Sequence, residues 1–272
     1  MASLARATAL FAAVLAAIPA FAEPAGIPPG ANDVKGYLLG ALTKMEQASE
    51  EFLANAVAYQ KLIDGNGGDP VKAGLVESFN RPGGNVTGVT TINAELGSKW
   101  LSLVGDLVPR AVSVAFLSAD SNYAKDQKSQ MLAAARALGR QIIILETRGD
   151  REYEMAFKML VEREAGALIV GPFPFRNIEK IVTLAARYKI PTIYPRRDYV
   201  DAGGLMSYAA DYADTYRQAG VYAGRILRGA KPSELPVMQA TKFELVINLK
   251  TAQTLGIEVP STLLALADEV IE

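Results

Sequence analysis

The chain has 272 residues and contains neither cysteine nor histidine. These two absences exclude disulfides, thiolate nucleophiles, Ser-His-Asp triads, and metal sites built on thiolate or imidazole ligands. The 28 basic and 29 acidic residues give a net charge of −1, which provides no attraction to nucleic acid or to an anionic membrane. Half of the residues are hydrophobic, so the composition is that of a globular protein.

The first 22 residues have the pattern of a cleavable signal peptide. Arg6 precedes an apolar run over residues 7–18, and Ala20-Phe21-Ala22 forms a small-x-small cleavage pattern. The run is shorter than the roughly 20 residues that span a bilayer, although a membrane anchor or a buried helix is the alternative interpretation. Because the chain has no cysteine to carry a lipid, we expect a released periplasmic protein with no direct membrane insertion after signal cleavage.

The next segment, residues 23–67, combines a linker with a helical pattern of unclear role. Proline and glycine are frequent in residues 23–30, and apolar residues then recur at helical spacing over residues 33–63. Glycine-rich turn chemistry at residues 64–68 ends the helical pattern.

From residue 86 onward, predicted strands and helices alternate. Strands are expected at residues 86–92, 112–117, 141–145, 167–170, 191–194, 205–208, 237–239 and 244–248. Helices are expected at residues 94–107, 125–138, 151–164, 177–188, 214–227 and 250–255, with Gly139 at the C′ position of the second. Uninterrupted apolar strands between helices favour a parallel sheet covered on both faces. The predicted fold class is α/β with doubly wound parallel sheets.

The loops at the carboxyl ends of these strands carry the candidate binding residues, because ligands of open parallel sheets bind there. The loops offer hydroxyl groups, aromatic rings and opposite charges, which suit a small zwitterion. Asp198 could pair with an ammonium group and Arg197 with a carboxylate. The candidates are Ser118, Asn122, Tyr123, Phe173, Phe175, Tyr194, Arg197 and Asp198. The alternative is that they are ordinary surface loops whose aromatic side chains cover the sheet ends.

Motifs of common enzymes are missing from the sequence. It lacks the glycine-rich nucleotide loops, the nucleophile elbow and the HExxH zinc motif. The glycine-rich stretch at residues 82–88 precedes a strand and is typical of a tight turn. We therefore expect no catalytic residue, no metal and no cofactor.

Several stretches are similar to those of a known family. They are GDPVK at 68–72, NRPGGNVTGV at 80–89, AGGLMSY at 202–208, YRQAGVYAG at 216–224, LPVMQ at 235–239, KFELVINLK at 242–250 and ADEVIE at 267–272. From Gly68 onward the chain resembles the exported substrate-binding proteins of ABC transporters, in the group with the periplasmic type I fold that includes tryptophan/tyrosine-type binders.

The resemblance implies two α/β lobes joined by hinge strands, with a small solute held between them. Residues 99–208 correspond to a complete second lobe. Residues 68–98 and about 209–272 correspond to a remnant of the first lobe with hinge and C-terminal elements. Family members begin with several βα units that have no counterpart in residues 23–67, so we expect an incomplete first lobe whose exposed elements lack their usual partners.

Two functional hypotheses follow. The leading one is the solute-binding component of an ABC importer, which captures a small amino-acid-like solute and delivers it to a permease at the inner membrane, impaired to the extent that the first lobe is short. The alternative is a non-transport interaction or sensor protein that binds a protein partner through the second lobe and the N-terminal helix.

Overall fold

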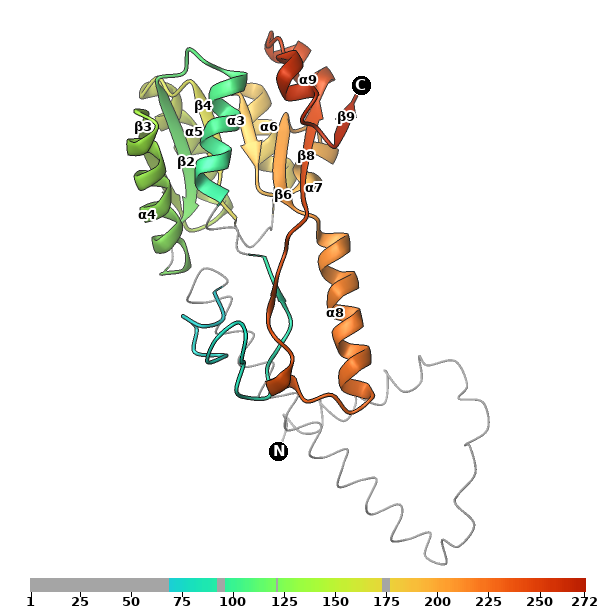
Figure 1. Cartoon of the computed structure of the whole chain (residues 1–272). Helices are drawn as coiled ribbons and strands as arrows, with labels where there is room; N and C mark the ends of the chain where they lie inside the picture. The colour runs from blue at the N-terminus through green and yellow to red at the C-terminus, as the bar shows by residue number, and fades with distance from the viewer. Residues whose placement is uncertain (1–68, 92–95, 121, 173–176) are drawn as a thin grey trace, which may run out of the picture. The chain divides into compact units, whose positions relative to one another are not determined.

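The computed structural model describes residues 69–91, 96–120, 122–172 and 177–272 (Figure 1). Two sheets occur within these ranges. One has seven strands in the order β3-β2-β4-β5-β6-β8-β9, and the other pairs β1 with β7. The predicted signal peptide and the predicted helix at residues 33–63 lie outside the described residues.

The larger sheet is parallel along most of its width. Its strands are β2 (Ser113–Ala119), β3 (Gln141–Thr147), β4 (Ala167–Val170), β5 (Thr192–Tyr194), β6 (Met206–Ala210), β8 (Phe243–Asn248) and β9 (Glu269–Ile271). Strands β2 to β6 run parallel, as their apolar runs predicted, whereas β8 pairs antiparallel with β6. Strand β9, which pairs parallel with β8, was not predicted. The C-terminal strands β8 and β9 therefore belong to the same sheet as β2 to β6.

Helices cover both faces of this sheet because its strands are apolar on both sides. The helices are α3 (Gly97–Leu107), α4 (Asn122–Ala137), α5 (Asp150–Glu162), α6 (Ile178–Arg187), α7 (Arg197–Asp201), α9 (Leu249–Leu255) and α10 (Ser261–Leu264). Phe116 packs with residues of α3 and α4, whereas its neighbour Leu117 packs with residues of α5 and α6. This alternation follows from the two-residue period of a strand and produces one apolar core on each face.

Gly139 lies just beyond the end of α4 with a φ of 64°, and its N–H bonds to the carbonyl of Arg136. This left-handed conformation is the one that a helix-ending glycine adopts, so the C′ prediction is confirmed.

The smaller sheet joins two stretches that are far apart in the sequence. Strand β1 (Val89–Thr90) is shorter than the strand predicted at residues 86–92, and it pairs parallel with β7 (Met238–Gln239). The Thr87 hydroxyl donates to the Leu235 carbonyl at 2.6 Å, and the Tyr222 hydroxyl donates to the Pro236 carbonyl at 2.7 Å. These bonds hold together segments that the sequence assigned to the first-lobe remnant.

Tyr222 belongs to helix α8 (Tyr212–Leu227), which the sequence predicted at residues 214–227. The Asp211 carboxylate accepts a hydrogen bond from the Asp214 N–H and caps the helix. Among the residues of this helix, Tyr222 is the one that is buried.

Candidate functional site

The order in which the chain adds strands to the large sheet reverses at β2. After β2 the chain forms β3 on one side, and it then returns to form β4 on the other side. The loops that follow β2 and β4 therefore leave the carboxyl edge in opposite directions, and open sheets bind ligands at such a point. Ser118 and Ala119 end β2 here, and Gly171 and Pro172 follow β4.

This edge is closely packed at its centre. Ser118 is 1% exposed, and its hydroxyl lies 3.4 Å from the Ala119 carbonyl. The N–H of Gly171 donates to the Leu117 carbonyl at 2.8 Å. A Cβ on Gly171 would lie 2.9 Å from the Phe116 ring, so this position has room for glycine alone.

Polar groups from β2 and β3 line the same edge. The Nε of Arg148 lies 2.7 Å from Oδ2 of Asp120, and this hydrogen bond and charge lower the pKa of Asp120. Thr147 is 2% exposed, and its hydroxyl has no hydrogen-bond partner among the described residues.

A second polar group follows β5. Arg196 forms an ion pair with Asp198, and its guanidinium lies 5.4 Å from the centre of the Tyr212 ring. The two charged side chains are 29% and 41% exposed. A cation, an anion and an aromatic ring are thus accessible together at the carboxyl end of β5.

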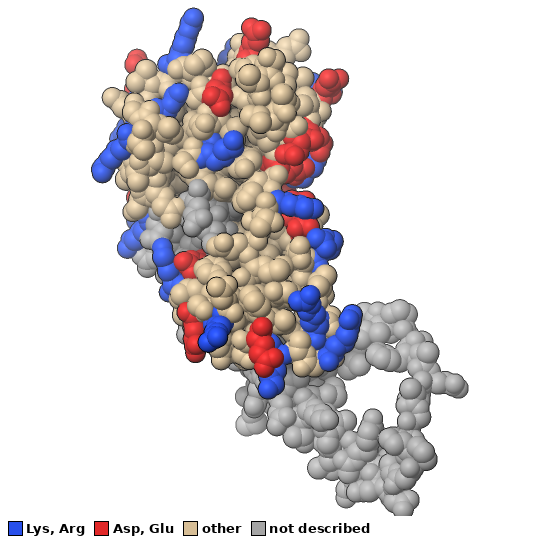
Figure 2. Space-filling model, in the orientation of Figure 1, with Lys and Arg blue, Asp and Glu red and all other residues tan. Residues whose placement is uncertain are grey.

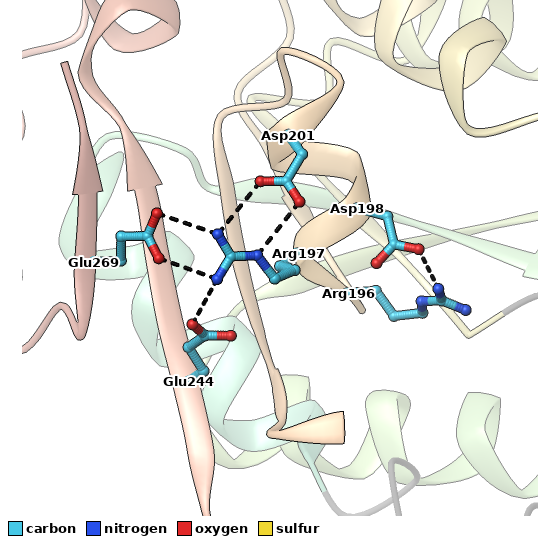
Figure 3. Close-up of polar contacts among 6 residues, drawn as sticks. All are labelled: Arg196, Arg197, Asp198, Asp201, Glu244 and Glu269. Carbon is cyan, nitrogen blue, oxygen red and sulfur yellow. Dashed lines mark hydrogen bonds and ion pairs between the residues drawn. The ribbon is translucent and has the colours of Figure 1, made fainter. Parts of the chain in front are cut away.

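Arg197 points away from this group (Figure 3). Its guanidinium nitrogens lie 3.3 Å from a carboxylate oxygen of Asp201, 2.9 Å from one of Glu244 and 3.0 Å from one of Glu269. The hydrogen bond to Glu269 is the largest cause that raises the pKa of Arg197 above its usual range. Acidic side chains gather on the surface over α7, β8 and β9 (Figure 2), and Arg197 is the cation bound among them.

Tyr194 lies in the core rather than in a loop. It is 1% exposed and stacks on Tyr199, with ring centres 4.8 Å apart. Burial raises the pKa of its hydroxyl above the usual range. Tyr194 therefore packs beneath the residues that follow β5.

The predicted binding residues thus fall into different settings. Ser118 and Asp198 lie at the carboxyl edge, whereas Arg197 and Tyr194 are engaged with other parts of the protein. For Asn122 and Tyr123 the structure describes the backbone at the start of α4 but not the side chains. Phe173 and Phe175 lie outside the described residues.

Arg196 was not among the predicted binding residues, although the sequence carries a pattern that points to it. Residues 197–201 form a helix, so Arg197 and Asp201 lie four residues apart on one side of it and pair. Recognising this short helix would have assigned Arg197 to that pair and Arg196 to Asp198.

Two features are absent from the ranges that the structure describes. No group of three or more acidic side chains there could hold a metal ion. None of the helices in those ranges combines the length and apolarity that crossing a bilayer requires.

The chain is similar to several known proteins. The chain is 28% identical over 198 residues to a tyrosine-binding protein of Clostridioides difficile, which covers 70% of this chain and 55% of that protein. The chain thus spans about half the length of this curated relative.

Two solved structures have a similar fold. An ABC domain from Streptococcus pneumoniae in complex with L-Trp is 27% identical, with a TM-score of 0.66, covering 75% of this chain and 69% of that one. A conserved domain protein from Vibrio cholerae is 25% identical, with a TM-score of 0.67 and the same two coverages. The sequence pattern of the ABC transporter substrate binding proteins matches residues 53–271, most of the chain. The chain therefore belongs to the family of ABC transporter substrate binding proteins.

Proposed function

We propose that the chain is the extracytoplasmic solute-binding component of an ABC importer, which captures an amino-acid-like solute and delivers it to a permease at the inner membrane. The observation that carries the proposal is the partly exposed Arg196–Asp198 pair beside Tyr212, in a chain of this family.

The pair matches the two charges of an amino acid. The Asp198 carboxylate would bind the ammonium group and the Arg196 guanidinium would bind the carboxylate, each exchanging its present partner for the ligand. The Tyr212 ring offers an apolar surface next to these charges. Ser118, also a predicted ligand contact, lies buried at the switch between β2 and β4. Phe173, Phe175, Asn122 and Tyr123 remain predicted ligand contacts.

The proposed ligand class is the aromatic amino acids. One relative is named a tyrosine-binding protein and another was crystallised with L-Trp, which supports this class. Arg197 and Tyr194 would support the site rather than contact the ligand. The guanidinium of Arg197 already pairs with Glu269, and the ring of Tyr194 already stacks on Tyr199. Periplasmic release after cleavage at residue 22 completes the proposal and remains a sequence-based prediction.

The test is ligand-dependent stabilisation of the protein purified from the periplasm. Thermal unfolding is followed with tyrosine, tryptophan and phenylalanine, with glutamate and a hexose as controls. Because a ligand that binds only the folded state stabilises it by mass action, we expect a higher melting temperature with at least one aromatic amino acid. No shift with any amino acid would overturn solute binding, while family membership would stand.

The alternative, an interaction or sensor protein without transport, is not favoured by the family match. It predicts no response to any solute in the same experiment, so the two hypotheses are separable.

A further inference from the structure

Asp211 belongs both to the large sheet and to helix α8. It directly follows β6, and its N–H donates to the Lys242 carbonyl at 2.9 Å, which continues the pairing of β6 with β8 by one residue. Its carboxylate accepts from the Asp214 N–H at 2.9 Å, and its carbonyl accepts from both the N–H and the hydroxyl of Thr215. One residue thus makes the last bond of the strand and caps the helix.

The turn that Asp211 caps carries the aromatic residue of the proposed ligand site. Tyr212 is the first residue of α8, and the Arg196 guanidinium lies 5.4 Å from the centre of its ring. Arg196 follows β5, which is the neighbour of β6 in the large sheet. The position of the ring relative to Arg196 therefore depends on the direction in which α8 leaves β6, and Asp211 lies at that point.

Farther along, α8 is attached to the smaller sheet. Of the described elements, β1 is the one that α8 contacts most, and the Tyr222 hydroxyl bonds to the Pro236 carbonyl just before β7 (Figure 1, orange helix). The helix is therefore anchored to the large sheet at its start and to the smaller sheet farther along. If the first anchor is lost, the smaller sheet orients the helix, and the Tyr212 ring is no longer fixed beside Arg196.

The cap is the strongest side-chain contact at this anchor. The Asp214 carboxylate lies 2.6 Å from Arg217 and 3.6 Å from Lys242, whose side chains are 61% and 65% exposed. Ion pairs with partners this exposed contribute little to stability, whereas a side-chain cap contributes more. Removal of the Asp211 carboxylate should therefore loosen the first turn although these pairs remain.

We propose that Asp211 is a positioning residue for ligand binding, which holds the Tyr212 ring beside the Arg196–Asp198 pair by capping α8 at the edge of the large sheet. The inference rests on the proposed function, because it concerns the same site. Asp211 acts through Tyr212 and not by contact with the ligand, since its N–H, carbonyl and carboxylate are already bonded within the chain. A loosened turn must be ordered when the ligand binds, and that ordering lowers the affinity.

Two substitutions at Asp211 test the cap. Asp211→Ala removes it, whereas Asp211→Asn keeps it, because asparagine caps helices as well as aspartate does. By isothermal titration below the melting transition, we expect Asp211→Ala to lower the affinity for the aromatic amino acid about fivefold or more. Asp211→Asn should stay within about twofold of the parent.

The matched control is the cap of another helix. Asn248 caps α9 by accepting a hydrogen bond from the Thr251 N–H at 3.0 Å. Because β8 runs antiparallel to β6, Asn248 lies at the opposite edge of the sheet from Asp211. Asn248→Ala should lower the melting temperature as Asp211→Ala does, but leave the affinity within about twofold of the parent. Equal losses of affinity in the two variants overturn the proposal.

A double-mutant cycle separates positioning from general destabilisation. If Asp211 acts through the ring of Tyr212, then Asp211→Ala should lower the affinity no further in a protein that already carries Tyr212→Leu. Losses of affinity that add in the double variant overturn the proposal.

NMR of the ligand-free protein tests the position of the ring without any solute. The ring current of Tyr212 should shift the side-chain resonances of Arg196, and Tyr212→Leu gives their values without the ring. Asp211→Ala should move these resonances toward the Tyr212→Leu values, whereas Asp211→Asn and Asn248→Ala should keep those of the parent. Resonances that do not move in Asp211→Ala overturn the proposal. If they move but the parent binds no amino acid, the positioning of the ring is supported and the proposed function fails.

Discussion

Arg197 and Glu269 form a two-pronged ion pair, in which Nη1 lies 3.0 Å from Oε2 and Nη2 lies 3.1 Å from Oε1. Since the same guanidinium meets Glu244, one side chain joins α7 to both β8 and β9. Strand β9 has three residues and lies at the edge of the sheet. This pair therefore ties a short edge strand to the helix that carries the proposed ligand residue Asp198.

Replacing Arg197 with methionine should destabilise the protein. The substitution leaves the carboxylates of Asp201, Glu244 and Glu269 close together without their shared cation. For a partly exposed network we expect a loss of about 1–3 kcal/mol in the free energy of unfolding, measured with urea. The control is Arg187→Met, which breaks an exposed pair with Glu154 and should cost less than about 1 kcal/mol. Equal losses of free energy in the two variants would show that the Arg197 network stabilises the protein no more than an ordinary surface ion pair does.

Glu244 should give the protein an unusual dependence on pH. Burial is the main cause that raises the pKa of Glu244 above the ordinary glutamate value of 4.5, and the charge of Arg197 opposes this effect. A group whose pKa is higher in the folded state contributes stability that is present below its unfolded pKa and is lost as the pH rises through its folded pKa. We therefore expect Glu244→Gln to match the parent near pH 4 and to exceed it at pH 7 by up to about 0.5 kcal/mol.

Urea unfolding at the two pH values measures this difference. Glu162→Gln, at an exposed position, serves as the control for the removal of a carboxylate elsewhere on the surface. A parent protein that is more stable than Glu244→Gln at pH 7 but not at pH 4 contradicts the assignment.

Gly171→Ala should disturb the switch point between β2 and β4. The added methyl group would lie 2.9 Å from the Phe116 ring and 3.0 Å from the Leu117 carbonyl, both in β2. Overpacking of this kind costs about 1–3 kcal/mol, which a fall in melting temperature reports. By contrast, Gly224→Ala in α8 has room, since its methyl group meets only Arg228, at 3.8 Å. It should gain up to about 1 kcal/mol from helix propensity, and a loss there comparable to that of Gly171→Ala would refute the steric argument.

Asp198→Asn should weaken binding of the aromatic amino acid. It removes the charge proposed for the ligand ammonium group, and we expect a loss of affinity of about tenfold or more by isothermal titration. Asp201→Asn is the matched control, because Asp201 is also on α7 but faces Arg197. Its affinity should stay within about threefold of the parent. Equal losses in the two variants would show that α7 acts through stability rather than through ligand contact.

Much of the larger sheet could be predicted because its strands are marked by short, local runs of apolar residues. Strand β4 was predicted with the bounds that the structure has, since four consecutive apolar residues between a glycine on each side allow few alternatives. Strand β9 was missed because its three residues carry no period of their own and form a strand only by pairing with β8. Helix α7 was missed for a similar reason, as one turn of helix gives too short a pattern.

The candidate site was harder to predict, because neighbouring residues can point in different directions. Arg196, Arg197 and Asp198 are consecutive and equally polar in the sequence. Their roles separate only when α7 folds and the distant Glu244 and Glu269 arrive beside it. The same holds for Tyr194. Its aromatic side chain suited a ligand contact, but its ring stacks on Tyr199 in the core.

The sequence by itself determined the family, the alternation of strands and helices, and the edge of the sheet at which a ligand is expected. Those properties depend on local periodicity, on short motifs, and on the fixed direction of parallel strands. Only the tertiary structure decided which arginine faces Asp198, which sheet receives residues 243–271, and which side of α8 stays exposed. Each of these depends on partners that lie far away in the chain, because an ion pair or a strand pair is set by proximity in space and not by order in the sequence.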